Sequence, residues 1–285
     1  MRLLYYFILI PLSLLPYFIL YKISDFLYVI IYKFLRYRRN TVYANIKNSF
    51  PEMNLTQINS LETRFYKHLC DLIVESIKGF TISEKQIKDR LKVINPGLVN
   101  NFADNNQSVI LVGGHYNNWE IAAQAFSLYH KHDCIGIYKP IKNKFFNKKL
   151  SKSRTTFGLN LVSMIGAKKI LNDATRIKAV IFGSDQSPSN AKKSYWLNFL
   201  NQETAVLFGA EKYAKEFNMP VIYVAINKIR RGYYEITYKI ITSQPKLTSH
   251  GSITESFTKE LETQIINQPE YWLWSHKRWK HKKIK

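Results

Sequence analysis

A short apolar run that ends in two glycines constrains the fold of this chain more than any other segment. Residues 108–123 read SVILVGGHYNNWEIAA. The stretch 108–113 is apolar, rich in β-branched side chains and bounded by glycine, which predicts a buried strand. Residues 118–130 then predict a helix. A buried strand, a glycine turn and a helix in this order are typical of a sheet whose faces are covered by helices.

The same alternation continues toward the C-terminus and predicts an α/β fold, with a mixed sheet flanked by helices. Before residue 96 the chain reads as mostly helical. We therefore divide it into an N-terminal membrane-associated helical segment (1–34) and a catalytic domain (35–285), with a helical entry region at 35–95 and an α/β core at 96–285. Expected strands are 134–138, 161–164, 178–183, 220–226 and 233–240, and expected helices are 143–157, 167–176, 204–217 and 252–267.

The first residues of the chain favour attachment to a membrane. Leu3–Tyr21 contains no charged residue and has the length of a bilayer span. Lys22 and Asp25 divide the apolar region, so a pair of helices lying in the interface is an alternative, as is a helix buried in the core. Basic residues follow at 33–39, and by the positive-inside rule they place the rest of the chain in the cytoplasm.

The charge of the chain predicts an anionic partner. It has 42 basic and 20 acidic residues, for a net charge of +22. Nucleic acid, an anionic membrane surface and an acidic carrier protein all fit this charge. The two cysteines, Cys70 and Cys134, have neither disulfide-framework nor zinc-ligand spacing, which favours a reducing compartment.

His115 and Glu120 are the first candidates for catalysis. Residues five apart point about 140° away from each other on a helix, so these two meet only if His115 lies in the turn and Glu120 in the first helical turn. A carboxylate held against an imidazole fixes its tautomer and raises its basicity, which suits a general base that takes a proton from an alcohol. In the alternative interpretation, Asn117 and Glu120 form a variant capping box and serve the helix end.

Five segments, in order along nearly the whole chain, carry a resemblance to a known family. The His-x4-Glu block resembles the first signature of the glycerolipid acyltransferases. The set as a whole resembles the late acyltransferases of bacterial lipid A biosynthesis, the lauroyl/myristoyl transferase family. The other matching segments are Leu35–Glu52, Tyr138–Pro140 with Arg154 and Gly158, Gly183–Gln186, and Gln268–Trp279.

The resemblance implies a membrane-bound O-acyltransferase on the cytoplasmic side of the bacterial inner membrane. In it His115 is the general base and Glu120 orients the ring. Arg154 binds an acceptor phosphate or the developing oxyanion, although by composition alone it is one cation on a solvated face. Asp185 and Gln186 form part of the acceptor or carrier pocket, or hold Arg154, although by themselves they also fit a turn. Gly114, Asn118 and Arg278 complete the expected substrate-binding residues.

The implied acyl donor is acyl carrier protein and the implied acceptor is a lipid A precursor or another lysolipid, with no metal and no organic cofactor. Two other functions remain open. One is a lysophospholipid or amino-acid-lipid acyltransferase, because the dyad is shared with those enzymes. The other is a basic membrane-binding adaptor without catalysis; no recognised nucleic-acid motif is present, and we expect no nucleic-acid partner.

Overall fold

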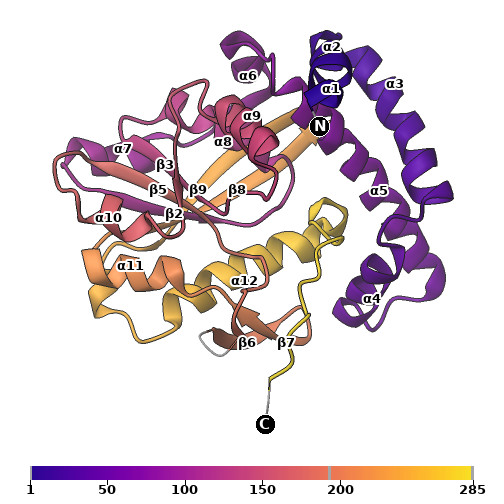
Figure 1. The fold of residues 1–285 in the computed structure, drawn as a ribbon. Helices are drawn as coiled ribbons and strands as arrows, with labels where there is room; N and C mark the ends of the chain where they lie inside the picture. The colour runs from indigo at the N-terminus through magenta and orange to yellow at the C-terminus, as the bar shows by residue number, and fades with distance from the viewer. Residues whose placement is uncertain (1, 192–193, 284–285) are drawn as a thin grey trace.

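The computed structural model describes residues 2–191 and 194–283 and has an α/β fold, as the sequence predicts (Figure 1). A seven-stranded sheet has the order β1-β9-β8-β2-β5-β3-β4. All neighbouring strands are parallel except β8 and β9, which are antiparallel, so the sheet is mixed. The strands are β1 Leu91–Val93, β2 Val109–Gly113, β3 Asp133–Tyr138, β4 Asn160–Ser163, β5 Lys178–Gly183, β8 Val221–Arg230 and β9 Tyr233–Thr242.

The helices after residue 38 surround this sheet. Two of them begin with capping boxes, in which Asn54 pairs with Gln57 and Ser83 with Gln86, and these satisfy backbone N–H groups at the helix ends. The helices are α4 Arg39–Ser49, α5 Leu55–Lys78, α6 Glu84–Arg90, α7 Gly97–Asp104, α8 Trp119–Tyr129, α9 Lys144–Arg154, α10 Ala167–Asn172, α11 Gly209–Phe217 and α12 Ser252–Asn267, with short 3-10 turns η4 Pro245–Leu247 and η5 Pro269–Tyr271.

Strand β2 lies between two hydrophobic clusters, which explains why its side chains are apolar. Ile110 and Val112 pack into a cluster with side chains of α5, α11 and α12, whereas Val109 and Leu111 pack into a second cluster with side chains of α7 and α8. Alternate residues of a strand face opposite sides of the sheet, so both faces are buried. The expectation of helices on both faces is confirmed.

One expected helix is wrong in its first part. Residues 204–217 were expected to form a single helix, but Gln202–Val206 is strand β7, which pairs with β6, Tyr195–Phe199, in an antiparallel hairpin. Only Gly209–Phe217 is helical, as α11. Thr204 and Val206 have β-branched side chains, which favour a strand. Leu200 and Asn201, both at positive φ, form the hairpin turn.

The N-terminal segment is helical but differs from the expected membrane span. The helix stops at Leu15 and Pro16, which are extended, with ψ values of 148° and 149°. Proline removes a backbone donor and disfavours helix in the residue before it, so one long helix becomes two. The parts are α1 Arg2–Leu4, the π-helical turn η1 Tyr5–Leu9 and α2 Ile10–Leu14, then α3 Tyr17–Tyr28 and the π-helical turn η2 Val29–Phe34. Within residues 2–191 and 194–283, no helix has both the length and the apolar character needed to cross a bilayer.

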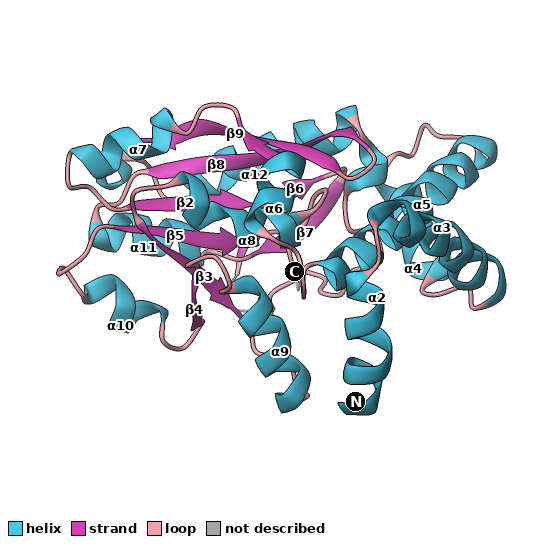
Figure 2. Ribbon diagram, turned by 90° about the horizontal axis from the view of Figure 1, so that it is seen from above, coloured by secondary structure: helices cyan, strands magenta, loops and turns pink. Residues whose placement is uncertain are grey.

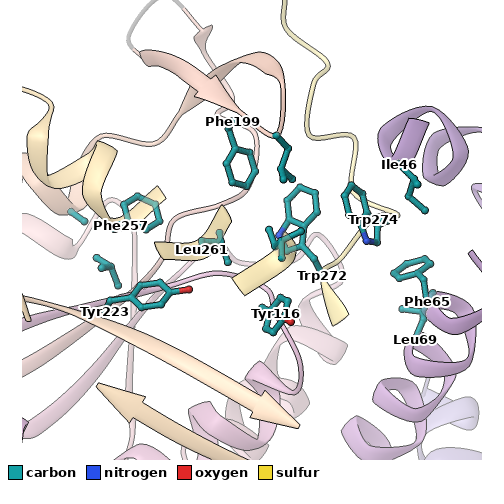
Figure 3. Packing of buried hydrophobic residues seen from close by; sticks show 14 of the residues in the cluster. Ile46, Phe65, Leu69, Tyr116, Phe199, Tyr223, Phe257, Leu261, Trp272 and Trp274 are labelled. Atoms are coloured by element: carbon teal, nitrogen blue, oxygen red, sulfur yellow. The ribbon is translucent and has the colours of Figure 1, made fainter. Parts of the chain in front are cut away.

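The C-terminal segment lies between the sheet and the helices α4 and α5 (Figure 3). Trp272 and Trp274 are among the largest fully buried side chains of the protein, and their rings meet edge to face at 4.8 Å. Phe199 of the hairpin packs on Trp272 from one side, while Phe50 packs on Trp274 from the other. This aromatic cluster fixes the closing segment against the edge of the sheet where the strands end.

Candidate active site

The register of two central strands brings the candidate residues together. Strands β2 and β5 are parallel neighbours, and Gly113 lies opposite Gly183. His115 and Asp185 each follow two residues after these glycines, so both lie beyond the carboxyl ends of adjacent strands. In open α/β sheets, ligands bind at this edge. His115 and Asp185 therefore meet although 70 residues separate them along the chain.

His115 and Asp185 form a closely bonded pair. The Nδ1 atom of His115 lies 2.6 Å from Oδ1 of Asp185, and the backbone N–H of His115 donates to Oδ2 at 2.9 Å. The indole N–H of Trp272 donates to the same Oδ2 at 2.9 Å. A carboxylate that accepts bonds from the Nδ1 side of an imidazole fixes its tautomer and leaves Nε2 to face a substrate.

This geometry corrects the expected pairing, in which Glu120 orients His115. Glu120 lies in the first turn of α8, as predicted, but its carboxylate is bound by Arg154 from the end of α9. The Nε atom of Arg154 donates to Oε2 at 2.8 Å and Nη2 donates to Oε1 at 2.5 Å. Trp119 donates its indole N–H to Oε1 at 3.2 Å. The expected contact between Asp185 and Arg154 is corrected as well, because each has another partner.

The ion pair Glu120–Arg154 nevertheless adjoins the histidine. The rings of His115 and Trp119 meet edge to face with centroids 5.2 Å apart, so Trp119 bridges the imidazole and Glu120. Both members of the pair are mostly buried, with side-chain exposures of 19% for Glu120 and 22% for Arg154. The bidentate fork holds the guanidinium in one orientation and leaves its other N–H groups available.

The electrostatics of the site favour a basic imidazole. Burial lowers the pKa of His115, but the Asp185 carboxylate and, more weakly, Glu120 outweigh this effect, so the pKa is raised above its ordinary value. Burial raises the pKa of Asp185, but the histidine and the donated hydrogen bonds bring it well below its usual range. The side chain of His115 keeps 23% of its surface exposed, so a substrate can reach it.

Gln186 faces the other nitrogen of the histidine. Its Nε2 atom lies 3.2 Å from Nε2 of His115, which fits an unprotonated ring nitrogen that accepts from the amide. Of the residues expected to bind substrate, Gln186 is thus the one whose side chain bonds to Nε2 of His115.

Gly114 and Asn118 both have structural partners, and their expected roles as substrate contacts stay predictions. A Cβ on Gly114 would lie 2.8 Å from Leu261 of α12, so the glycine permits the close packing of this helix. Asn118 is buried, accepts a bond from the backbone N–H of Ile121 and donates to Glu75. It is the N-cap of α8, which also replaces the alternative capping box of Asn117 and Glu120.

Arg278 is likewise buried, at 2% exposure, and its expected place on the border of the acceptor site stays a prediction. Its Nη1 donates to the carbonyl oxygen of Ala205 in β7 at 2.7 Å. Burial lowers the pKa of Arg278 to about 10, and Asp185 opposes this change. The guanidinium therefore fastens the C-terminal segment to the hairpin and supplies positive charge behind Asp185.

Sequence reasoning missed Trp272 and Glu75. Trp272 lay in the closing signature without an assigned partner, and its bond to Asp185 depends on the fold. Glu75 is buried in α5 and accepts bonds from Tyr21, Asn118 and Tyr234. Its burial raises its pKa. A glutamate within an apolar helical stripe was the available signal. Among the described residues, no group of three or more His, Cys, Asp or Glu side chains is placed to hold a metal ion.

A histidine held by a carboxylate at the edge of a mixed α/β sheet is typical of a group-transfer enzyme that activates a hydroxyl. A family model described as bacterial lipid A biosynthesis acyltransferase matches residues 1–281. The chain therefore belongs to the bacterial lipid A biosynthesis acyltransferase family and is an acyltransferase.

Two curated proteins are similar to this chain. One is the lipid A biosynthesis palmitoleoyltransferase of Escherichia coli (strain K12), which is 19% identical over 253 residues, or 88% of this chain and 81% of that protein. The other is the lipid A biosynthesis acyltransferase of Shigella flexneri, with the same identity and coverage.

Proposed function

We propose that this enzyme transfers a fatty acyl group from acyl carrier protein to a hydroxyl of a lipid A precursor, with His115 as the general base and Asp185 as the residue that orients it. The observation that carries this proposal is the bond between His115 Nδ1 and Asp185 Oδ1 at 2.6 Å, with Nε2 left for the acceptor. The family supplies the reaction class.

The proton and bond changes balance without an acyl-enzyme. Nε2 of His115 takes the proton of the acceptor hydroxyl as its oxygen attacks the thioester carbonyl. The carbonyl oxygen becomes an oxyanion while the C–O bond forms. When the carbonyl reforms, the C–S bond breaks, and the imidazolium returns its proton to the leaving thiolate. Asp185 remains ionised throughout and stabilises the imidazolium.

Arg154 is the candidate for binding negative charge in this reaction. Glu120 occupies Nε and one N–H of Nη2, so the pair holds the guanidinium in place while other donors stay free. A preorganised cation in a site of low exposure stabilises an oxyanion or a substrate phosphate far better than it would in water. The kinetics of Arg154→Lys separate these two functions, because one changes kcat and the other changes KM.

The N-terminal helices support attachment to a membrane surface. Leu3 and Phe7 are each 74% exposed. Helix α9, which carries several lysines, packs against this segment, and Lys149 donates to the hydroxyl of Tyr6 at 3.0 Å. Figure 2 shows α9 and the N-terminal helix projecting from the same side of the molecule. Exposed apolar side chains beside lysines suit the interface of an anionic bilayer, and we propose that this surface lies on the cytoplasmic face of the inner membrane.

The function is tested by acyl transfer with purified protein. Acylated carrier protein and a lipid A precursor are supplied, and the acylated product is followed by mass spectrometry. The wild type should form the product, and His115→Ala should lose about 10²–10⁴-fold in rate while remaining folded. A lysophospholipid or an amino-acid lipid serves as the competing acceptor. Faster transfer to that acceptor, or wild-type rates from His115→Ala, would contradict the proposal.

Membrane attachment is tested by vesicle sedimentation. Leu3→Asp/Phe7→Asp should move the protein from anionic vesicles into the soluble fraction, because burying two new charges is unfavourable. The matched control is Leu247→Asp/Ile266→Asp, which changes two exposed apolar residues elsewhere and should leave sedimentation unchanged. Equal loss in both variants would mean that the N-terminal surface has no special part in binding.

A further inference from the structure

A basic cleft lies at the start of α4, outside the residues assigned to acyl transfer. Its volume is about 900 Å³, and its walls include Arg36, Arg38 and Arg39 together with the polar side chains of Asn40 and Thr41. No acidic side chain is among the described residues that line it. Arg39 has a carboxylate partner behind the wall of the cleft, the buried Glu62, whereas Arg36 and Arg38 have no carboxylate partner among the described residues, so a local excess of positive charge remains.

Most of the donors in this cleft have no partner of their own. The guanidinium of Arg36 makes no hydrogen bond or ion pair within residues 2–191 and 194–283, although its backbone carbonyl accepts from the N–H of Arg39. Arg38 uses one N–H, which donates from Nη1 to the carbonyl oxygen of Ser275 at 3.0 Å. Arg39 approaches the buried Glu62, with Nε 3.4 Å from its Oε2. Each guanidinium has five N–H donors, so the group keeps enough of them to surround a phosphate.

The neighbouring side chains are those of a membrane interface. Phe34 and Leu35, directly before the arginines, are 77% and 69% exposed. Exposed apolar side chains next to arginines fit a ligand that is anionic at one end and apolar at the other. The N-terminus of α4 adds positive potential through the helix dipole, although the N–H groups of Arg39 and Thr41 already donate to the carbonyl oxygens of Arg36 and Arg38.

The C-terminal segment connects this cleft with the edge of the sheet where His115 and Asp185 lie. Besides the bond of Arg38 to Ser275, Asn45 of α4 donates to the carbonyl oxygens of Trp274 and His276. His276 in turn accepts a bond from the backbone N–H of Ser187, the neighbour of Gln186. The cleft is therefore fastened to the same segment whose Trp272 binds Asp185.

We propose that this cleft, which we call the α4 arginine cleft, binds the phosphate group of a phosphorylated lipid. The phosphate lies among Arg36, Arg38 and Arg39, and the acyl chains lie along the exposed side chains of Phe34 and Leu35. Two sources have this chemistry: the acceptor itself and an anionic lipid of the surrounding bilayer. The first source rests on the proposed function, whereas binding of the phosphate does not.

Binding is tested with a soluble probe, dihexanoyl phosphatidic acid as monomers, titrated into the full chain by calorimetry. Arg36→Gln/Arg38→Gln should weaken binding about tenfold, since two charge-assisted contacts are lost. Lys131→Gln/Arg176→Gln is the matched control, because it removes two exposed cations that pair only with surface carboxylates; it should change the affinity less than about twofold. Equal weakening by both pairs would overturn the proposal, since binding would then depend on overall charge alone.

A milder variant guards against disturbance of the C-terminal segment. The side chain of Arg36 has no hydrogen-bond or ion-pair partner in the described residues, so Arg36→Gln should leave the fold intact. It should weaken binding of the probe about threefold, and Arg36→Lys should recover part of the loss. Neutral dihexanoylglycerol should bind wild type and Arg36→Gln equally. No effect of Arg36→Gln on phosphatidic acid would contradict the site.

The source of the phosphate is settled by two further measurements on Arg36→Gln/Arg38→Gln. A raised KM for a phosphorylated lipid A precursor, with the KM for its dephosphorylated form unchanged, identifies the acceptor. Weaker binding to phosphatidylcholine vesicles doped with phosphatidic acid, with both KM values unchanged, identifies a bilayer lipid. If neither the KM for the phosphorylated precursor nor the binding to these vesicles changes, the proposal is overturned. Because calorimetry needs no turnover, an enzyme with a different acyl-transfer reaction would leave the binding result standing.

Discussion

Two carboxylates lie near His115 and differ in what neutralises them. Asp185, in the turn after β5, is surrounded by an imidazole, a backbone N–H and an indole N–H. Glu120, in the first turn of α8, is bound by a bidentate guanidinium and a different indole. The first arrangement keeps a carboxylate aimed at the ring nitrogen. The second makes an ion pair whose net charge is close to zero, so its influence on the histidine is smaller.

This difference indicates that the partner of a histidine expected from spacing along the chain differs from the partner given by the order of strands in the sheet. Glu120 is five residues from His115, yet it faces α9. Asp185 is 70 residues away, yet the parallel register of β2 and β5 places it beside the ring. The carboxylate that follows the histidine in the motif thus holds Arg154, while the carboxylate that follows the neighbouring strand holds the imidazole of His115.

Asp185→Asn should have the largest effect. An amide in this place cannot stabilise the imidazolium, and it favours the wrong tautomer, so we expect kcat to fall about 10²-fold or more. The acid limb of kcat/KM should also move to lower pH, because loss of the carboxylate lowers the pKa of His115 and a base works only when neutral. A pH series of initial rates checks both effects. A loss of less than about tenfold at every pH would contradict the assignment.

Changes in the Glu120–Arg154 pair should have a smaller effect, about tenfold, through the lost position of the guanidinium. Arg154→Lys keeps the charge but not the fork. If Arg154 stabilises the oxyanion, kcat should fall with little change in KM; if it binds an acceptor phosphate, KM should rise. Glu120→Gln should act in the same direction as Arg154→Lys. A larger loss from Glu120→Gln than from Asp185→Asn would reverse the comparison of the two carboxylates.

Most of the fold could be predicted from the sequence, because apolar strands and periodic helices are recognisable from short stretches of residues. The apolar run of β2 and the glycines after it predicted a buried strand and a turn, and both are present. The prediction missed the hairpin β6–β7 because only two residues separate strand β7 from helix α11, so the run 204–217 was assigned to one helix. The N-terminal helix is in two pieces because of Pro16, and a prediction from the length and apolar character of Leu3–Tyr21 does not include this break.

The site was only half accessible. His115, Asp185, Glu120 and Arg154 were all named, because motif blocks carry them. Their pairing was not, since it depends on the order of the strands: β2 and β5 are neighbours in space but are separated along the chain by β3 and β4. The burial of Arg278 was also not predicted, because a sequence does not reveal which basic residues of a motif face inward.

The most direct test of the account is the pKa of His115, measured by NMR of ring-labelled protein and assigned among its seven histidines with His115→Gln. The wild type should titrate above the ordinary imidazole value. Asp185→Asn should lower this pKa, whereas Glu120→Gln/Arg154→Gln, which removes one negative and one positive charge together, should leave it nearly unchanged. If the second variant lowered the pKa more than Asp185→Asn did, Glu120 rather than Asp185 would be the partner of the catalytic base.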